Sequence, residues 1–185
     1  SGKARGPRDP ALPPRLLAVG RVAPQKGYRT LISALAHIAD RPWSMTILGD
    51  GPLLEDAKNW ASKSDLTGRI EFRGFVSDVT SYFAQSDILV LSSQWEGFPA
   101  VPIEAMASGC AVVATDCSAG LTALLNENGQ NTVPIQSPEA LARAIADEMD
   151  CPQQIGTIWA SATTYSVENS VDEHLRLVDR LCTTP

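Results

Sequence analysis

Short apolar runs alternate with longer segments of helical period from Arg15 onward, and this alternation limits the chain to few folds. A buried parallel strand reads as a short apolar run, and parallel strands need a crossover that is usually a helix. The expected strands are Leu16–Val19, Met45–Leu48, Ile70–Arg73, Ile88–Leu91, Ala111–Ala114 and, more weakly, Thr132–Ile135. The expected helices are Tyr28–Ala39, Pro52 to about Ser64, Val79–Gln85, Ile103–Ser108 with Gly109 as its left-handed cap, Pro138–Met149, Ile155–Thr163 and Val167–Leu181.

This order predicts an α/β fold, a Rossmann-like doubly wound parallel sheet of about six strands with helices on both faces. The run Ile88–Leu91 is the most apolar, so we expect it to be the central strand. In such sheets, ligands bind outside the carboxyl ends of the strands where the strand order reverses. Functional residues should therefore lie in the loops that follow strands.

Composition narrows the class of protein further. The chain carries a formal net charge of −6, which argues against a nucleic-acid partner, because a phosphate backbone is bound through clustered lysine and arginine. No apolar run approaches the roughly 20 residues of a spanning helix, so we expect a cytoplasmic protein. Residues 1–14 are rich in Gly, Pro and basic residues and are interpreted as a flexible linker or tag remnant, with one domain over residues 15–185.

The loop from Gly20 to Gly27 leaves the first expected strand and enters a helix. It carries Arg21 and Lys26, and the free N–H groups of the helix start favour an anion beside these cations. Arginine can form paired hydrogen bonds to phosphate oxygens, while lysine acts as a point charge. From these residues alone, a phosphate site and an ordinary exposed loop are equally acceptable.

A second loop, from Trp95 to Gly109, follows the most apolar strand and carries Glu96 and Glu104. Carboxylates accept hydrogen bonds from sugar and ribose hydroxyls. Between the two glutamates, the backbone N–H groups of Phe98, Ala100 and Val101 are candidate phosphate donors, whereas the prolines of this loop have no N–H. For either glutamate alone, a surface role is the simpler interpretation.

Taken together, these motifs resemble a known family. Glu96-Gly97-Phe98-Pro99, a second glutamate with seven residues between, and Ala105-Met106-Ala107-x-Gly109 are similar to the donor-site signature of the retaining glycosyltransferases of family 4. The resemblance extends to Gly20-Arg21-x5-Gly27, to Gly49-Asp50-Gly51-Pro52 and to Phe72-x-Gly74-Phe75-Val76. It implies one half of a two-domain GT-B fold, with the acceptor-binding N-terminal domain missing from this chain.

The resemblance also implies a role for each matched residue. Arg21 and Lys26 would clamp the donor diphosphate with the backbone of Ala100 and Val101. Glu104 would hold the ribose hydroxyls, and Phe75 and Val76 would line the base pocket. Glu96 would be the catalytic residue, contacting the transferred sugar in a segment that includes Gly97 and Phe98. Because no Asp-x-Asp motif occurs, we expect transfer without a metal or another cofactor.

The implied partners are a nucleotide sugar, most often UDP-linked in this family, and a glycan or lipid-linked acceptor bound through the missing domain. They place the full-length protein in the cytoplasm, with possible contact at the inner face of the membrane, in polysaccharide or glycolipid synthesis. Ala123 and Thr132 depart from the family pattern, which has an acidic residue and a glycine there. Two alternatives remain open, a non-catalytic regulatory or scaffolding domain and a GT-B epimerase or phosphorylase.

Overall fold

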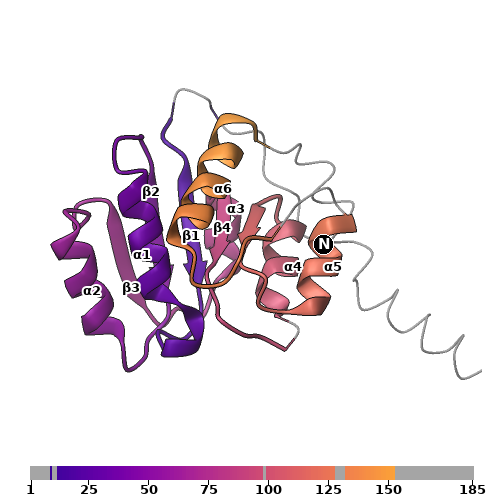
Figure 1. Ribbon diagram of the computed structural model, residues 1–185, viewed down its shortest axis with the longest axis horizontal. Helices are drawn as coiled ribbons and strands as arrows, with labels where there is room; N and C mark the ends of the chain where they lie inside the picture. Colours follow the sequence, from indigo (N-terminus) through magenta and orange to yellow (C-terminus); the bar gives the residue numbers. More distant parts are fainter. Residues whose placement is uncertain (1–8, 10–11, 98, 128–131, 153–185) are drawn as a thin grey trace, which may run out of the picture.

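A computed structural model of the 185-residue chain describes residues 9, 12–97, 99–127 and 132–152. Over these residues the chain forms one parallel sheet with helices packed around it (Figure 1). The five strands are β1 (Arg15–Val19), β2 (Ser44–Leu48), β3 (Ile70–Gly74), β4 (Ile88–Leu91) and β5 (Ala111–Ala114). The helices are the 3₁₀ turn η1 (Pro24–Lys26), α1 (Tyr28–His37), α2 (Leu54–Lys63), α3 (Thr80–Gln85), α4 (Ala100–Ala107), α5 (Ala119–Glu127) and α6 (Pro138–Asp150).

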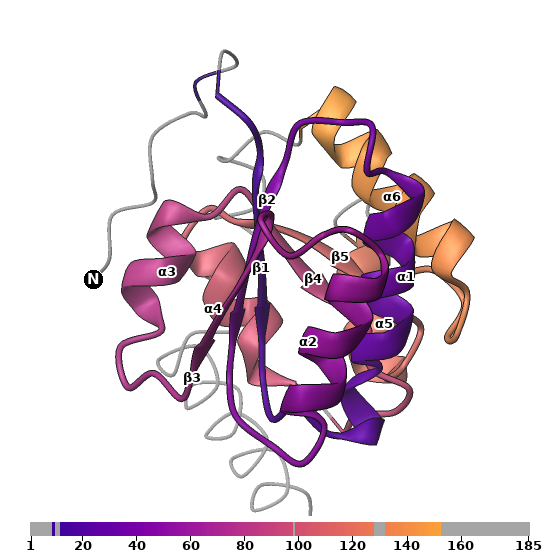
Figure 2. The ribbon, with the colours of Figure 1, turned by 90° about the vertical axis from the view of Figure 1, so that its left-hand side faces the viewer.

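Side-chain alternation along the strands divides the core into two layers. Leu16 and Ala18 of β1 pack with α1, α2 and α6, while Leu17 faces a second layer containing residues of α3, α4 and α5. Figure 2 shows α3 and α4 on one side of the sheet and α1 and α6 on the other. Because both faces are covered, β4 and β5 are entirely apolar and buried, as expected for a buried parallel sheet, whereas the edge strand β3 carries Glu71 and Arg73.

The strand order is β3-β2-β1-β4-β5, with every neighbouring pair parallel. The chain builds outward from β1 to β3, crosses back through α3 and continues with β4 on the opposite side of β1. The order therefore reverses between β1 and β4, and the loops after these two strands flank the switch point. This confirms the predicted doubly wound fold.

Two strand predictions were wrong. The central strand is β1 rather than β4, since β1 is the third of the five strands in the sheet order and β4 the fourth. Apolarity did not mark the centre because the edge strand β5 is as completely buried as β4. The expected sixth strand, Thr132–Ile135, makes only an isolated bridge between Thr115 and Val133. Pro134 follows the bridge and has no N–H with which to extend a ladder.

The predicted helices were confirmed within a few residues at each end, where the structure describes them. Gly109 follows α4 at φ +78°, as a left-handed C-terminal cap requires. Helix α5 was not expected, and the two expected helices beyond Cys151 lie outside the described residues. Within the described ranges, none of the helices combines the length and apolarity needed to cross a membrane.

Candidate functional site

The loops after β1 and β4 are joined at the switch point by several hydrogen bonds. The backbone N–H of Gln94 donates to the carbonyl of Gln25 at 2.7 Å, and the Ser92 hydroxyl donates to the carbonyl of Lys26 at 2.8 Å. Gly27 adopts φ +63° directly against Ser92, where an added Cβ would lie 2.0 Å from the Ser92 carbonyl oxygen. These contacts place the side chains of the two loops beside one another.

Lys26 and Glu96 form an ion pair across these loops. The Lys26 Nζ lies 2.5 Å from Glu96 Oε1, and the two side chains are only 19% and 11% exposed. The backbone of Glu96 is held as well, since its N–H donates to the Cys117 carbonyl at 2.8 Å. Low exposure reduces screening by water, so the Coulomb attraction within this pair is stronger than in an exposed ion pair. The structure thus joins two residues that the sequence placed seventy positions apart.

Two neutral side chains also donate to the Glu96 carboxylate. The Ser93 hydroxyl lies 2.8 Å from Oε1, and the Gln25 amide nitrogen lies 3.3 Å from Oε2. The same amide nitrogen donates to the Trp95 carbonyl at 2.9 Å. Sequence reasoning missed both residues, although each stands close to a residue that it singled out. Their positions could have indicated a role: Ser93 is a polar residue just after the buried strand β4, and Gln25 lies in the loop that carries Arg21 and Lys26.

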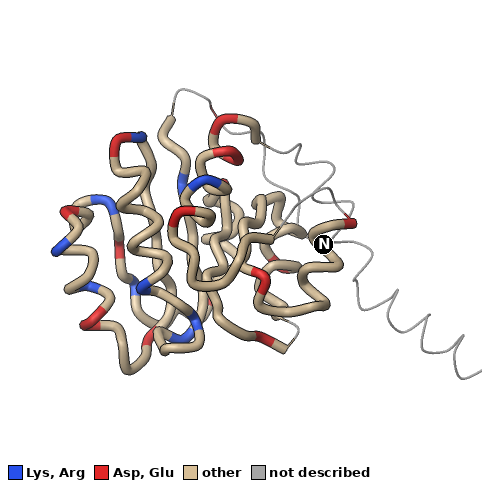
Figure 3. Tube along the Cα trace, in the orientation of Figure 1, with Lys and Arg blue, Asp and Glu red and all other residues tan. Residues whose placement is uncertain are grey.

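The charges of the site come from two differently charged parts of the chain. Between Arg73 and Arg143 the sequence contains no lysine or arginine, whereas it contains several acidic residues there. Figure 3 shows the consequence, because the part of the fold around α4 and α5 carries only acidic positions. Lys26, from the loop after β1, therefore supplies positive charge to Glu96 across the switch point.

A cavity of about 430 Å³ lies beside this cluster at the carboxyl ends of β1 and β2. Its lining includes Arg21, Phe75 and Val76, three of the residues selected from sequence, together with apolar side chains of the neighbouring strands. Gly20 also lines it and lies against the Lys26 stem, since an added Cβ would meet Lys26 Cε at 3.1 Å. The cavity and the ion pair are therefore adjacent.

The remaining selected residues surround the start of α4. Gly97 and Ala100 are exposed, Val101 is half-buried, and Phe98 lies outside the described residues. Helix α4 begins at Ala100, three residues before the expected start at Ile103, so the first N–H groups of the helix are those of Ala100 and Val101. Glu104 lies one turn further on with an exposed side chain, and it is not among the residues that line the cavity beside Arg21.

Cys117 and Thr115 lie beneath the Glu96 loop. Burial raises the pKa of the Cys117 thiol, and a hydrogen bond with Thr115 acts in the opposite direction. A thiol of raised pKa stays protonated near neutral pH and is a poor nucleophile. Cys117 is therefore a packing residue of this loop.

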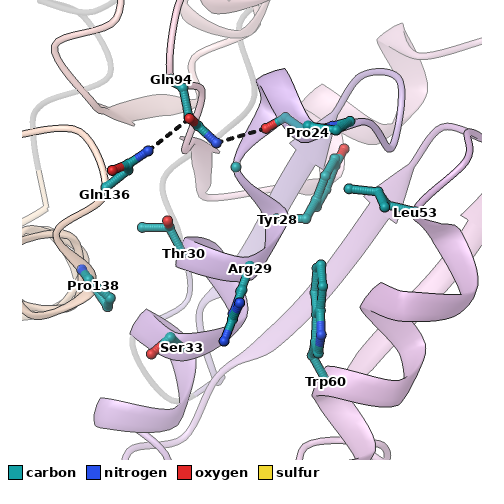
Figure 4. A pocket seen from close by; sticks show the side chains of 11 residues that line it. Pro24, Tyr28, Arg29, Thr30, Ser33, Leu53, Trp60, Gln94, Gln136 and Pro138 are labelled. Carbon is teal, nitrogen blue, oxygen red and sulfur yellow. Dashed lines mark hydrogen bonds between the residues drawn. The ribbon is translucent and has the colours of Figure 1, made fainter.

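A second cavity, of about 510 Å³, lies on the far side of the same loops, over α1 and between α2 and the start of α6 (Figure 4). Gln94 closes one wall, because its amide nitrogen donates to the Pro24 carbonyl at 3.0 Å and its oxygen accepts from Gln136 at 2.8 Å. Arg29 is the charged residue of the lining. Gln94 thus connects the loop carrying Glu96 to the loop carrying Lys26 on the side of the second cavity.

Comparison with known proteins places the chain in a family. Residues 13–150 match the family model described as "Glycosyl transferases group 1". A glycosyltransferase of Haemophilus influenzae is 37% identical over 118 residues, covering 62% of this chain and 33% of that protein. The lipopolysaccharide core biosynthesis mannosyltransferase LpsB of Rhizobium meliloti is 29% identical over 170 residues, covering 86% and 48%. The chain spans less than half the length of these curated relatives.

Solved structures agree on the fold. Alr3699/HepE of Anabaena, solved in complex with UDP, superposes with a TM-score of 0.77 at 22% identity, over 95% of this chain and 50% of that one. The C-terminal domain of a group 1 family protein, LpcC from Francisella tularensis, gives a TM-score of 0.67 at 23% identity, over 82% of each chain. With the family match over most of its length and this fold, the chain belongs to the group 1 glycosyltransferases.

Proposed function

We propose that this chain is the donor-binding domain of a retaining, family 4 glycosyltransferase that takes a sugar from a nucleotide diphosphate sugar. The observation that carries the proposal is the cavity lined by Arg21, Phe75 and Val76, directly beside the Lys26–Glu96 contact. An apolar cavity with a few convergent polar groups is the usual form of a small-molecule site. It lies at the switch point, where doubly wound sheets bind ligands.

Each part of the donor has a matching group in this arrangement. Phe75 and Val76 offer apolar surface to the base, and Arg21 and Lys26 offer positive charge to the diphosphate. Breaking the sugar–phosphate bond leaves additional negative charge on the diphosphate, which preorganised cations and helix N–H groups stabilise. In this proposal Glu104 binds the ribose, and Glu96 contacts the transferred sugar next to its anomeric carbon.

The acceptor belongs to a part of the protein beyond this domain. We propose a glycan or lipid-linked acceptor, and UDP as the nucleotide, with transfer at the cytoplasmic side of a membrane. Two observations support this choice: LpsB acts in lipopolysaccharide core biosynthesis, and Alr3699/HepE was solved with UDP. In the proposed mechanism Arg21 and Lys26 act in place of a divalent metal ion.

Calorimetric titration of the chain with UDP, GDP and ADP in the presence of EDTA tests the proposal. One diphosphate should bind in preference to the others, and Lys26→Ala should weaken it about 10-fold or more, as expected for loss of a charged hydrogen bond. Glu104→Ala should weaken it through the ribose. Lys58→Ala and Glu139→Ala are controls, because Lys58 forms an exposed ion pair with Glu55 on α2, and Glu139 is exposed at the start of α6 and does not line the cavity beside Arg21.

Absence of binding by all three diphosphates would contradict the proposal. Binding that Lys58→Ala weakens as much as Lys26→Ala would contradict the site assignment. In the first case the non-catalytic domain becomes the better description of the chain.

A further inference from the structure

The Glu96 carboxylate is held by more donors than its proposed contact with the sugar requires. Lys26, Ser93 and Gln25 all donate to it, and Lys26 is the charged one of the three. This carboxylate is therefore fixed by both its oxygens before any ligand is considered. The question is which donors keep it in place during donor binding.

The proposed function gives Lys26 a second partner. A diphosphate carries more negative charge than a carboxylate, so it competes with Glu96 for the Lys26 ammonium group. Lysine is a flexible point charge with three donors, and it can share or transfer its hydrogen bonds. In either case, Glu96 receives less stabilisation from Lys26 when the diphosphate is bound.

The segment around Glu96 supplies no replacement for Lys26, because the sequence from Gly74 to Ala142 contains no lysine or arginine. Arg21, which lines the adjacent cavity, is assigned to the diphosphate in the proposed function. Neutral donors must then hold the carboxylate. Ser93 and Gln25 are the two neutral side chains that contact it among the described residues. As neutral groups, Ser93 and Gln25 are attracted less strongly to the diphosphate than Lys26 is, so they can remain hydrogen-bonded to Glu96.

Ser93 is the better anchored of these two donors. Its side chain is fully buried, and its carbonyl accepts a hydrogen bond of 2.6 Å from the equally buried Thr115 hydroxyl. Thr115 follows β5 and Ser93 follows β4, so neighbouring strands fix the serine. A buried hydroxyl cannot exchange its partner for bulk water, which makes its hydrogen bond to Glu96 persistent. Gln25 is longer and partly exposed, and its hydrogen bond is weaker at 3.3 Å.

We propose that Ser93, assisted by Gln25, is a positioning residue that keeps the Glu96 carboxylate in place when Lys26 turns to the donor diphosphate. This inference rests on the proposed donor site and adds to it two residues that act through Glu96. Its consequence is specific: the serine matters for binding of the sugar and not for binding of the diphosphate.

The test compares the dissociation constants of UDP-glucose and UDP, and of GDP-mannose and GDP, by calorimetry on the wild-type chain and variants. Ser93→Ala should leave the dissociation constant of the diphosphate within about 2-fold of the wild-type value. It should raise the ratio of the dissociation constant of the nucleotide sugar to that of the diphosphate about 5- to 10-fold. Gln25→Ala should raise the same ratio about 2-fold, since its hydrogen bond is longer. Ser93→Thr, which keeps the hydroxyl, should restore the wild-type ratio.

Two matched controls lie elsewhere in the fold. Ser86 is also buried, but its hydroxyl donates to the Tyr82 carbonyl before β4 begins. Gln85 donates to the Ser81 carbonyl on the surface. Ser86→Ala and Gln85→Ala should leave the ratio unchanged. Thermal melting shows whether each variant is folded. If Ser93→Ala does not fold, Ser93→Cys takes its place, because cysteine is of similar size and its thiol is a weaker hydrogen-bond donor.

An unchanged ratio in Ser93→Ala would overturn the inference while leaving the donor site intact. An equal loss of affinity for diphosphate and nucleotide sugar would also overturn it, because the serine would then serve only the general structure. If the wild-type chain binds no nucleoside diphosphate, the proposed function fails, and the positioning role fails with it.

Discussion

At the scale of single residues, Gly27 decides whether the two loops of the site can approach. Its φ of +63° is strained for any other residue, and a Cβ there would lie 2.0 Å from the Ser92 carbonyl oxygen. We expect Gly27→Ala to lower the free energy of unfolding by about 2–4 kcal/mol and to weaken diphosphate binding, because Lys26 would be displaced. Urea denaturation measures the first effect and calorimetry the second.

Gly68 provides the matched control for this substitution. It lies in a turn where an added Cβ would meet nothing within 4 Å. Gly68→Ala should change stability by less than about 1 kcal/mol. Equal denaturation midpoints for the two alanine variants would show that the close approach at Gly27 is not needed.

At the scale of elements, Arg69 ties the start of β3 to the segment that leads into β2. Its guanidinium group donates to the carbonyls of Ala39, Arg41 and Trp43 and lies 3.6 Å from the centre of the Trp43 ring. Burial lowers the pKa of Arg69 from its usual value, but arginine remains charged at neutral pH. This one side chain therefore holds the segment between α1 and β2 against the start of β3.

We expect Arg69→Ala to destabilise the chain by about 2–3 kcal/mol, since the carbonyls of three residues lose their donor and the contact with the buried Trp43 ring is lost. Arg69→Lys should recover less than half of the loss, because an ammonium group cannot reach carbonyls in three directions as a planar guanidinium does. Arg73→Ala is the control, because Arg73 pairs with Glu71 on the surface and should contribute less than about 1 kcal/mol. Chemical denaturation compares the three variants. A full recovery by lysine would contradict this account.

Helix α5 and the expected sixth strand show where local patterns fail. Helix α5 has Leu121, Leu124 and Leu125 buried at helical spacing, but it is short and has Gly120 in its first turn, a weak helix former. Its stability comes from packing against the sheet, which no local pattern reports. Conversely, the strand expected after Asn131 has apolar residues, but Pro134 limits its pairing to one bridge.

At the scale of the whole molecule, the chain spans less than half the length of its curated relatives. Transfer requires an acceptor held in the correct geometry beside the donor, and such positioning can contribute several orders of magnitude to a rate. We expect the 185-residue chain to bind the donor yet to release UDP from UDP-sugar at least about 100-fold more slowly than the full-length protein with its acceptor. A coupled assay of UDP release measures the rate for the 185-residue chain and the rate for the full-length protein. Comparable rates would show that this domain holds the complete site.

The sequence by itself determined the parallel α/β fold, the five strands of the sheet among the six expected, and the two loops that carry Arg21, Lys26, Glu96 and Glu104. It could do so because buried strands and crossover helices have different periods, and because ligands bind at the carboxyl ends of strands. The resemblance to the family added a role to each residue, and those roles await the binding measurements. The family itself is established by the match over residues 13–150.

Only the tertiary structure decided which of these residues meet. Strand order cannot be read from local periodicity, so neither the central place of β1 nor the contact between Lys26 and Glu96 followed from the sequence. The hydrogen bonds of Ser93 and Gln25 to Glu96 likewise depend on packing between loops that are far apart in the chain. The physical reason is that these contacts form only because the chain passes from β3, at one edge of the sheet, to β4, on the opposite side of β1. Contacts between residues so far apart in the chain are not encoded in local sequence patterns.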